Sequence, residues 1–257
     1  MSDIEFRTEG HVAHVRLNRP SSLNAITPAM DAALRDAWLE INATPDVWVA
    51  VLSAEGERAF CAGADVSGES NGNRPRMALG GGLTGVGGPL LKLTKPLIAA
   101  VQGHVVGGGM ELALCADIIV AADTTKFSMP ETRVGIIGES GIMHRAIRQL
   151  PQRVAMAMIL TGERMPAADA LHHGLVNEVV AYDELADAAG RWAEKICAAS
   201  PLAVQAAKDA VLGRLGYPLE VALQTRYEPI EAFAFSADQR EGRSAFAEKR
   251  APNWQGR

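Results

Sequence analysis

The chain has 257 residues, of which 48% are hydrophobic and 21% are charged, and these proportions are typical of a globular protein. This length is enough to bury a large core in one domain, with or without a helical annex. The formal net charge of -5 excludes a globally basic surface, so we expect no nucleic acid partner, because a phosphate backbone attracts positive charge.

The N-terminus and the cysteines predict where the protein resides. Acidic and basic residues are interspersed in the first ten positions, where an export signal would be apolar, and no uncharged apolar stretch reaches the length of a membrane span. Cys61, Cys115 and Cys197 are odd in number, lie far apart and have no histidines at the spacing of a zinc site. We therefore expect a cytoplasmic protein with reduced thiols, no metal site and no membrane partner.

The first two thirds of the chain predict alternating strands and helices. Apolar and polar residues alternate over residues 11–17, which is typical of a half-buried strand. Thr27 followed by Pro28 resembles the start of a helix, and apolar residues at helical spacing continue to Asn42. Helical patterns between the strands favour parallel pairing in a layered α/β core. Short apolar runs predict three further strands that are covered on both faces, at residues 47–52, 97–101 and 117–121.

The last third predicts helices. Amphipathic segments cover residues 185–199, 202–214 and 219–235. We expect them to form an annex for packing or subunit contact, and therefore divide the chain into a core at 1–195, which carries the site, and a helical region at 196–257. A glycine-rich stretch between Ser67 and Pro89 predicts a mobile loop.

Three glycines at residues 107–109 precede a run of good helix formers and predict a turn into a helix. The first amides of a helix lack intrahelical partners, and glycine lets a ligand oxygen approach the backbone closely. Gly108 N–H is therefore a candidate oxyanion donor, with the carboxylate of Glu111 nearby. The alternative is that the glycines only permit tight packing and that Glu111 only suits a first helical turn. Leu112 breaks the dinucleotide fingerprint G-x-G-x-x-G.

Two further segments are weak signals when each is taken alone. Residues 58–66 are mostly small and could expose backbone amides, or they form a plain tight turn. Pro130 forces an extended or turning backbone just before the carboxylate of Glu131, for which an exposed surface position is the alternative. The combination of these segments, in their order and spacing, is more specific than any one of them.

Six motifs follow one another along the chain: Leu17-Asn18-Arg19-Pro20, Leu23-Asn24-Ala25, Ala59-Phe60-Cys61-Ala62-Gly63-Ala64-Asp65, Gly107-Gly108-Gly109-Met110-Glu111, Pro130-Glu131 and Ala245-Phe246-Ala247-Glu248-Lys249-Arg250. This ordered set resembles the crotonase family, also called the enoyl-CoA hydratase/isomerase superfamily, over nearly the whole chain. The resemblance implies an α/β fold with a crotonase-like ββα spiral core and a C-terminal helical oligomerisation region.

The resemblance also implies a site for an acyl-CoA thioester. The backbone amides of Ala64 and Gly108 would hold the thioester carbonyl. Phe246 and Lys249 resemble residues that reach the CoA of a neighbouring subunit, where a cation suits the nucleotide phosphate. This arrangement implies a homotrimer or a dimer of trimers. Further CoA or substrate contacts are implied for Leu23, Asn24, Ala25, Ala62, Gly63 and Asp65.

The implied reaction is the reversible addition of water to a 2-enoyl-CoA, as in fatty acid metabolism, which gives a 3-hydroxyacyl-CoA. Two amide donors would stabilise the enolate-like species, and one such donor is worth on the order of 3 kcal/mol. Glu111 would activate water and Glu131 would protonate the α-carbon. Two acids suffice without a metal or a cofactor, since CoA is part of the substrate. Family isomerases and decarboxylases often keep only one of these acids, so the pair favours hydration or dehydration.

Gly138 and Glu139 depart from the family pattern, which commonly has proline and then glycine or aspartate. Glu139 would add a third carboxylate to the acyl pocket and favour a polar acyl chain, or else it is an exposed loop side chain. Ser67 stands where some members use a lysine toward the CoA phosphate. The alternatives are thus an enoyl-CoA isomerase, a carnitinyl-CoA-type dehydratase, or a non-catalytic acyl-CoA-binding scaffold. We expect no catalytic role for His104, His144 and His173.

Overall fold

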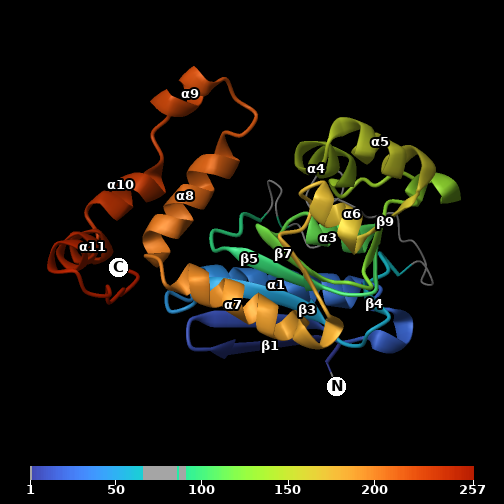
Figure 1. The fold of residues 1–257 in the computed structure, drawn as a ribbon, viewed down its shortest axis with the longest axis horizontal. Coiled ribbons are helices and arrows are strands. Elements are labelled where there is room, and N and C mark those ends of the chain that lie inside the picture. The colour runs from blue at the N-terminus through green and yellow to red at the C-terminus, as the bar shows by residue number, and fades with distance from the viewer. Residues whose placement is uncertain (1, 66–85, 87–90) are drawn as a thin grey trace.

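Two β-sheets organise the chain in the computed structural model, which describes residues 2–65, 86 and 91–257 (Figure 1). The larger sheet has six strands in the order β1-β2-β3-β5-β7-β10. β1 and β2 pair antiparallel, whereas every later pair in this sheet is parallel, as the sequence predicts. The strands are β1 (Ile4–Glu9), β2 (Val12–Leu17), β3 (Val49–Ala54), β5 (Leu97–Val101), β7 (Ile118–Ala122) and β10 (Glu178–Val180).

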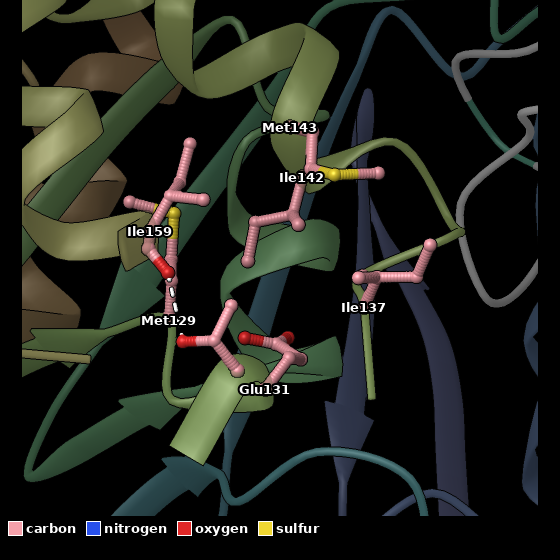
Figure 2. A pocket seen from close by; sticks show the side chains of 8 residues that line it. Met129, Glu131, Ile137, Ile142, Met143 and Ile159 are labelled. Atoms are coloured by element: carbon pink, nitrogen blue, oxygen red, sulfur yellow. Dashed lines mark hydrogen bonds between the residues drawn. The ribbon is translucent and has the colours of Figure 1, made fainter. Parts of the chain in front are cut away.

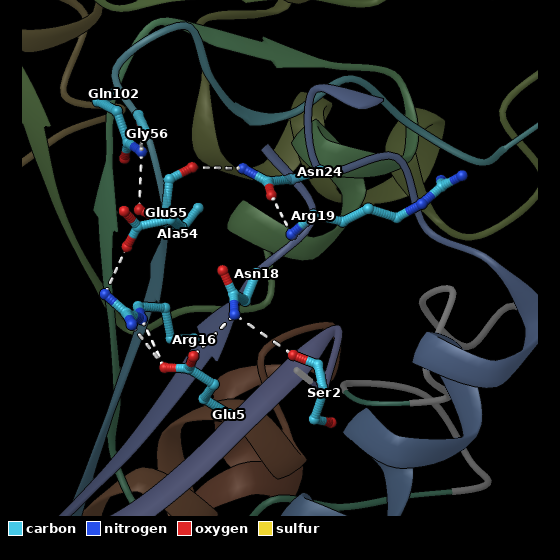
Figure 3. Close-up of polar contacts among 10 residues, drawn as sticks. All are labelled: Ser2, Glu5, Arg16, Asn18, Arg19, Asn24, Ala54, Glu55, Gly56 and Gln102. Carbon is cyan, nitrogen blue, oxygen red and sulfur yellow. Dashed lines mark hydrogen bonds and ion pairs between the residues drawn. The ribbon is translucent and has the colours of Figure 1, made fainter. Parts of the chain in front are cut away.

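Four of these strands lie within two residues of their predicted ends, but β1 and β10 are not expected from the sequence. β1 carries alternate charges and is mostly exposed, so its hydrophobic pattern is weak. It is held instead by backbone pairing with β2 and by a polar cluster at the sheet edge, where Arg16 and Asn18 both donate to Glu5 (Figure 3). Arg16 also donates to Glu55, which ties this edge to the end of β3.

The smaller sheet has four strands in the order β4-β6-β8-β9. β4, β6 and β8 are parallel neighbours, and each follows a strand of the larger sheet after at most four residues. The units β5-β6-α3 and β7-β8-α4 thus have the predicted ββα order, in which the chain spirals between the two sheets. The strands are β4 (Ala59–Cys61), β6 (His104–Val106), β8 (Lys126–Ser128) and β9 (Arg164–Pro166). The α-helices of the two units are α3 (Gly108–Ala113), after β6, and α4 (Ile142–Gln149), after β8.

Helices cover both faces of the larger sheet. Val49 and Val51 of β3 pack on one face with α7 (Leu185–Cys197), whereas Ala50 and Leu52 point into the main core. α1 (Pro28–Ala43) joins that main core and begins where predicted, since the Thr27 hydroxyl accepts a hydrogen bond from Met30 N at 3.2 Å. Among the described residues, the body also contains α5 (Gln152–Thr161), α6 (Ala167–His172), η1 (Pro20–Ser22), η2 (Glu131–Val134) and η3 (Tyr182–Glu184).

The C-terminal helices extend away from this body, and the chain then turns back (Figure 1). They are α8 (Pro201–Gly213), α9 (Leu219–Gln224), α10 (Glu228–Ala234) and α11 (Ala237–Glu248). The predicted continuous segment at 219–235 is wrong, because Thr225 leaves the helical conformation and Pro229 lies in the first turn of α10, where it starts a new helix. Trp254 Nε1 donates to Ala198 O, which fastens the chain end to the end of α7.

The predicted division between residues 195 and 196 falls inside α7, which packs on the sheet throughout its buried face. The division itself stays a prediction. The predicted loop between Ser67 and Pro89 lies outside the described residues, except for Val86. Within the described part of the chain, no helix combines the length and hydropathy that crossing a bilayer requires.

Gly109 sets how closely α3 packs on β4. A Cβ atom at this position would lie 2.2 Å from Cys61 O and 2.8 Å from Cys61 Cβ, which is closer than atoms can approach. Glycine therefore allows the first turn of α3 to rest directly on the last residue of β4. This contact brings the segment after β4 next to the start of α3.

We predict that Gly109→Ala lowers the free energy of unfolding by about 3 kcal/mol, because the obstructing atoms are backbone and cannot turn aside. Urea unfolding measures the change. The matched control is Gly190→Ala in α7, where a Cβ meets nothing within 4 Å and should stabilise the helix by about 0.5–1 kcal/mol. Equal stability of Gly109→Ala and the wild type would contradict the close packing.

Candidate active site

Three of the predicted segments follow three adjacent parallel strands. Residues 62–65 follow β4, Gly107 and Gly108 follow β6, and Glu131 comes soon after β8. Because parallel neighbours end at the same edge of a sheet, the three segments meet there. The smaller sheet thus brings together the residues that the sequence analysis treats as separate signals.

The segments after β4 and β6 approach each other through their backbones. Gly63 has a φ of 106°, and a Cβ there would lie 3.4 Å from Gly108 N. Ile26 pairs with Ala64 by donating to Gly63 O at 2.8 Å and accepting from Asp65 N at 2.9 Å. In this parallel bridge the N–H of Ala64 itself points away from Ile26.

Gly108 is the first residue of α3, so its N–H has no partner within the helix. Gly107 precedes it with a φ of 54°, a conformation that glycine adopts without strain. The amides of Ala64 and Gly108 therefore lie on neighbouring segments at the same sheet edge. Two such donors suit an oxygen atom that gains negative charge.

Glu111 is buried in α3, with 3% of its surface exposed. Its Oε1 accepts hydrogen bonds from Ser140 N at 3.0 Å and from Ile142 N at 3.4 Å. The pKa of the Glu111 carboxyl is raised to about 7, mainly by burial and also by the charge of Glu131, although the two amides and the Ser140 side chain offset part of the rise. The carboxyl is consequently present in both protonation states near neutral pH.

Glu131 begins η2 and is half-buried. Its Oε1 lies 3.3 Å from where a Cβ of Gly107 would be, which places this carboxylate beside the turn that carries Gly108. Burial also raises the pKa of the Glu131 carboxyl. The two acids therefore flank the same glycine turn.

A small cavity of about 20 Å³ opens next to Glu131. Figure 2 shows the carboxylate of Glu131 below α4, with Met129 and Ile159 on one side and Ile137 on the other. Apart from Glu131 the side chains around it are almost all apolar. Such a recess suits a small apolar group rather than a charged one.

Asn24 has a structural role that the sequence analysis does not predict. Its side chain is fully buried, accepts from Arg19 N at 2.9 Å and donates to Glu55 O and Ala59 O at 3.0 and 2.9 Å (Figure 3). The side-chain amide is therefore occupied within the protein, and a contact of Asn24 with CoA stays a prediction. Leu23 and Ala25 on either side are half-buried.

The segment around Asn24 is bonded to residues 62–65, which include the predicted oxyanion donor Ala64. Leu23 O accepts from Ala62 N at 3.0 Å, and Arg19 pairs with Asp65 at 2.7 Å. Arg19 also donates to Ala25 O at 3.2 Å, so its guanidinium joins both segments. The sequence motif contains Arg19, but only the fold reveals this bridging position.

Other predicted residues lie outside this cluster. Glu139 is exposed on the loop before α4, and its contact with substrate stays a prediction. Phe246 and Lys249 are exposed, on α11 and just after it, and α11 lies well apart from α3 (Figure 1). Ser67 lies outside the described residues. In the part of the chain that the structure describes, no three His, Cys, Asp or Glu side chains group as a metal site.

The loop before α4 contributes two site residues that the sequence analysis misses. Ser140 and Ile142 bind Glu111 through their amides, and Gly141 between them has a φ of 106°. Gly138 leaves room for the start of α4 beside Glu111, since a Cβ there would be 2.1 Å from Ile142 Cγ2 and 3.3 Å from Glu111 Oε1. The signal in the sequence is a pair of glycines just before a helix, which does not by itself indicate a carboxylate partner.

Comparison with known proteins agrees with this geometry. The family model for enoyl-CoA hydratase/isomerase matches residues 7–257. The chain is 38% identical to the (E)-benzylidenesuccinyl-CoA hydratase of Thauera aromatica, over 98% of this chain and 99% of the relative. It is also 38% identical to the carnitinyl-CoA dehydratase of Proteus mirabilis, over 99% and 98%.

Two solved structures have the same fold. A crystal structure from Novosphingobium aromaticivorans, assigned as a short-chain enoyl-CoA hydratase, is 65% identical with a TM-score of 0.92 and full coverage of both chains. The enoyl-CoA hydratase of Mycobacterium tuberculosis is 35% identical with a TM-score of 0.91, and the match covers 99% of each chain. The similarity thus extends from the body through the C-terminal helices.

The raised pKa of Glu111 predicts a pH-dependent stability difference. The folded carboxyl has a pKa of about 7 and its ordinary value is 4.5, so between these pH values the folded protein binds more protons than the unfolded chain, and stability falls as pH rises. Glu111→Gln removes this loss, and above pH 7 the variant should be more stable than the wild type by about 3 kcal/mol. Below pH 4.5 the two should converge.

Urea unfolding of both proteins from pH 4.5 to 8 measures this difference. The matched control is Glu139→Gln, because that carboxylate is exposed and its loss should leave the pH dependence unchanged. Parallel stability curves for the wild type and Glu111→Gln would show that Glu111 is not held in a desolvated environment.

Proposed function

Because the chain belongs to the enoyl-CoA hydratase/isomerase family, we propose that it catalyses the reversible addition of water to a 2-enoyl-CoA, giving a 3-hydroxyacyl-CoA. It is a hydro-lyase. The observation that carries this proposal is that two acids, the buried Glu111 and the half-buried Glu131, flank the turn that presents Gly108 N–H. An acyl-CoA-binding scaffold would have no need of two acids whose pKa values are both raised.

The amides of Ala64 and Gly108 hold the thioester carbonyl in this proposal. Attack at the β-carbon moves negative charge onto that oxygen, and two fixed N–H donors stabilise the charge without reorganising. The close approach of Gly63 to Gly108 N supports a common target for both donors. The interaction strengthens as charge develops, so it lowers the barrier rather than merely binding substrate.

The two acids move the protons. In the hydration direction, the Glu111 carboxylate takes a proton from water while the hydroxide oxygen bonds to the β-carbon, and the C=C electrons pass to the carbonyl oxygen. The electrons then return as the α-carbon takes a proton from the Glu131 carboxylic acid. Glu111 is then protonated and Glu131 is ionised, so a proton returns from Glu111 to Glu131 through solvent before the next cycle. Water is thus added in full, no electrons are exchanged with a cofactor, and CoA is part of the substrate. A raised pKa keeps Glu131 protonated more readily at the start.

We place the CoA along residues 23–25 and 62–65, with Phe246 and Lys249 contributed by another subunit. These two residues lie far from α3 within their own chain, which supports contact across a subunit boundary (Figure 1). A homotrimer, or a dimer of trimers, would supply that boundary. Lys249 is exposed and carries the positive charge that suits a phosphate.

Exposed apolar side chains support the proposed oligomer. They gather on α8, on α9 and on the link between them, and their exposure is too large for a surface that always faces water. The helices that carry them project from the body (Figure 1). These side chains are Val211 60%, Leu212 56%, Leu215 62%, Tyr217 56%, Leu219 68% and Leu223 77% exposed.

A second candidate is the dehydration of a more polar acyl-CoA, which is the same chemistry in reverse. The similarity to a carnitinyl-CoA dehydratase favours it, and so does the position of Glu139 between Gly138 and Ser140, both of which contact Glu111. Glu139 would then face the polar part of the acyl group. Activity across a panel of acyl-CoAs separates this candidate from hydration of simple enoyl-CoAs and from double-bond isomerisation.

We predict that adding the protein to crotonyl-CoA removes the absorbance of the conjugated thioester, and that Glu111→Gln and Glu131→Gln each slow this loss by about 100- to 10,000-fold. Each variant lacks one proton transfer but keeps the shape of the side chain. Glu194→Gln, at an exposed glutamate on α7, is the matched control and should stay within about threefold of the wild type. Binding of enoyl-CoAs without any loss of absorbance would instead indicate a scaffold.

Lys249→Ala should raise KM about fivefold and leave kcat nearly unchanged, because an exposed phosphate contact is worth about 1 kcal/mol and lies far from the reacting carbons. Steady-state kinetics with crotonyl-CoA test this. Lys195→Ala, an exposed lysine on α7, is the matched control and should leave KM unaltered. An unchanged KM in Lys249→Ala would remove the phosphate role.

A further inference from the structure

Ser140 is a buried serine whose hydroxyl is left without a hydrogen bond. Its exposed fraction is 0%, and among the residues that the structure describes its Oγ has no partner. Buried hydroxyl groups are nearly always hydrogen-bonded, so an exception calls for a bound molecule or a functional reason. The position of Ser140, next to Glu111 in the proposed active site, suggests which molecule that is.

Hydrogen bonds hold the backbone of Ser140 on both sides, and the whole residue is buried. Ser140 N donates to Glu111 Oε1 at 3.0 Å, and Arg145 Nη1 donates to Ser140 O at 2.9 Å. Ile142 N, two residues later, donates to the same Oε1 at 3.4 Å. Both ends of the Ser140 residue are therefore held, one by the acid and the other by α4.

Of the two carboxylate oxygens of Glu111, only Oε1 accepts hydrogen bonds from the described residues. Within the described residues, both amide bonds go to Oε1, and none goes to Oε2. The Ser140 side chain is close enough to act on this carboxyl, since it lowers the pKa, but it does not reach hydrogen-bond geometry with it. A small molecule with both donors and acceptors would complete the bonding of the two groups.

We propose that Ser140 Oγ and Glu111 Oε2 together bind the water molecule that adds to the substrate. One O–H of this water donates to Glu111, which takes that proton, and the other O–H donates to Ser140 Oγ. Both hydrogens are then directed into the protein, and a lone pair remains for the β-carbon. Ser140 keeps its own proton throughout, so the atoms and electrons balance as in the proposed reaction.

This inference rests on the proposed function and adds a residue to it. It also distinguishes two half-sites: Ser140 and Glu111 serve the water, whereas Glu131 and the two amides serve the α-carbon and the carbonyl. A saturated acyl-CoA has no double bond for water to attack, but Glu131 can still exchange its α-hydrogen. The two activities therefore report separately on the two halves.

The experiment compares Ser140→Ala and Ser140→Cys with the wild type in two assays. The first is hydration of crotonyl-CoA, and the second is exchange of the α-hydrogen of butyryl-CoA in D₂O, followed by NMR. We expect hydration to fall about tenfold, which is the loss of one hydrogen bond, and exchange to change less than twofold. The melting temperature should not fall, because Ser140 Oγ makes no hydrogen bond within the described protein.

Ser200→Ala is the matched control for a buried serine with a structural role. Its Oγ donates to Asp238 and accepts from Ala203 N, so its loss should lower the melting temperature and leave the hydration rate of the folded protein unchanged. Wild-type hydration rates in both Ser140 variants would overturn the inference. So would a joint fall of hydration, exchange and melting temperature. Absence of hydration in the wild type would overturn the proposed function itself.

Discussion

Backbone packing between the end of β4 and the first turn of α3 is the constraint on which the site depends. Gly109 rests on Cys61, and Gly63 approaches Gly108 N, so no side chain separates the two segments. The amides of residues 64 and 108 can therefore serve one oxygen atom. Parallel pairing of β4, β6 and β8 then brings Glu131 to the same edge. The proposed catalytic centre thus depends on a contact between two backbone segments.

The surroundings of the two acids follow from that packing. Glu111 lies in α3, after the glycine turn. Its carboxylate accepts hydrogen bonds from the amide of Ser140, in the loop before α4, and from the amide of Ile142, the first residue of α4. Glu131 lies beside the same turn, next to a mostly apolar recess. Burial keeps both carboxyls easier to protonate than in water, which suits groups that must both take and give protons near neutral pH.

Local sequence patterns predict much of the fold and the main acids, because they encode strand runs, helix starts and glycine turns. Thr27 caps α1 as predicted, and residues 97–101 form the expected strand. Interactions between distant segments are harder to predict. β1 is held by pairing with β2. The side-chain amide of Asn24 donates to the carbonyl groups of Glu55 and Ala59. Ser140 matters only because the fold places it beside Glu111. β2 directly follows β1, but the partners of Asn24 and Ser140 lie 29 to 35 residues away along the chain.

The most direct test of the account is a crystal structure with an unreactive acyl-CoA thioester bound. The account predicts that the thioester carbonyl oxygen accepts hydrogen bonds from the amides of both Ala64 and Gly108, with the α-carbon facing Glu131 and the β-carbon facing Glu111. A carbonyl oxygen bound elsewhere, with either amide turned to another partner, would contradict it.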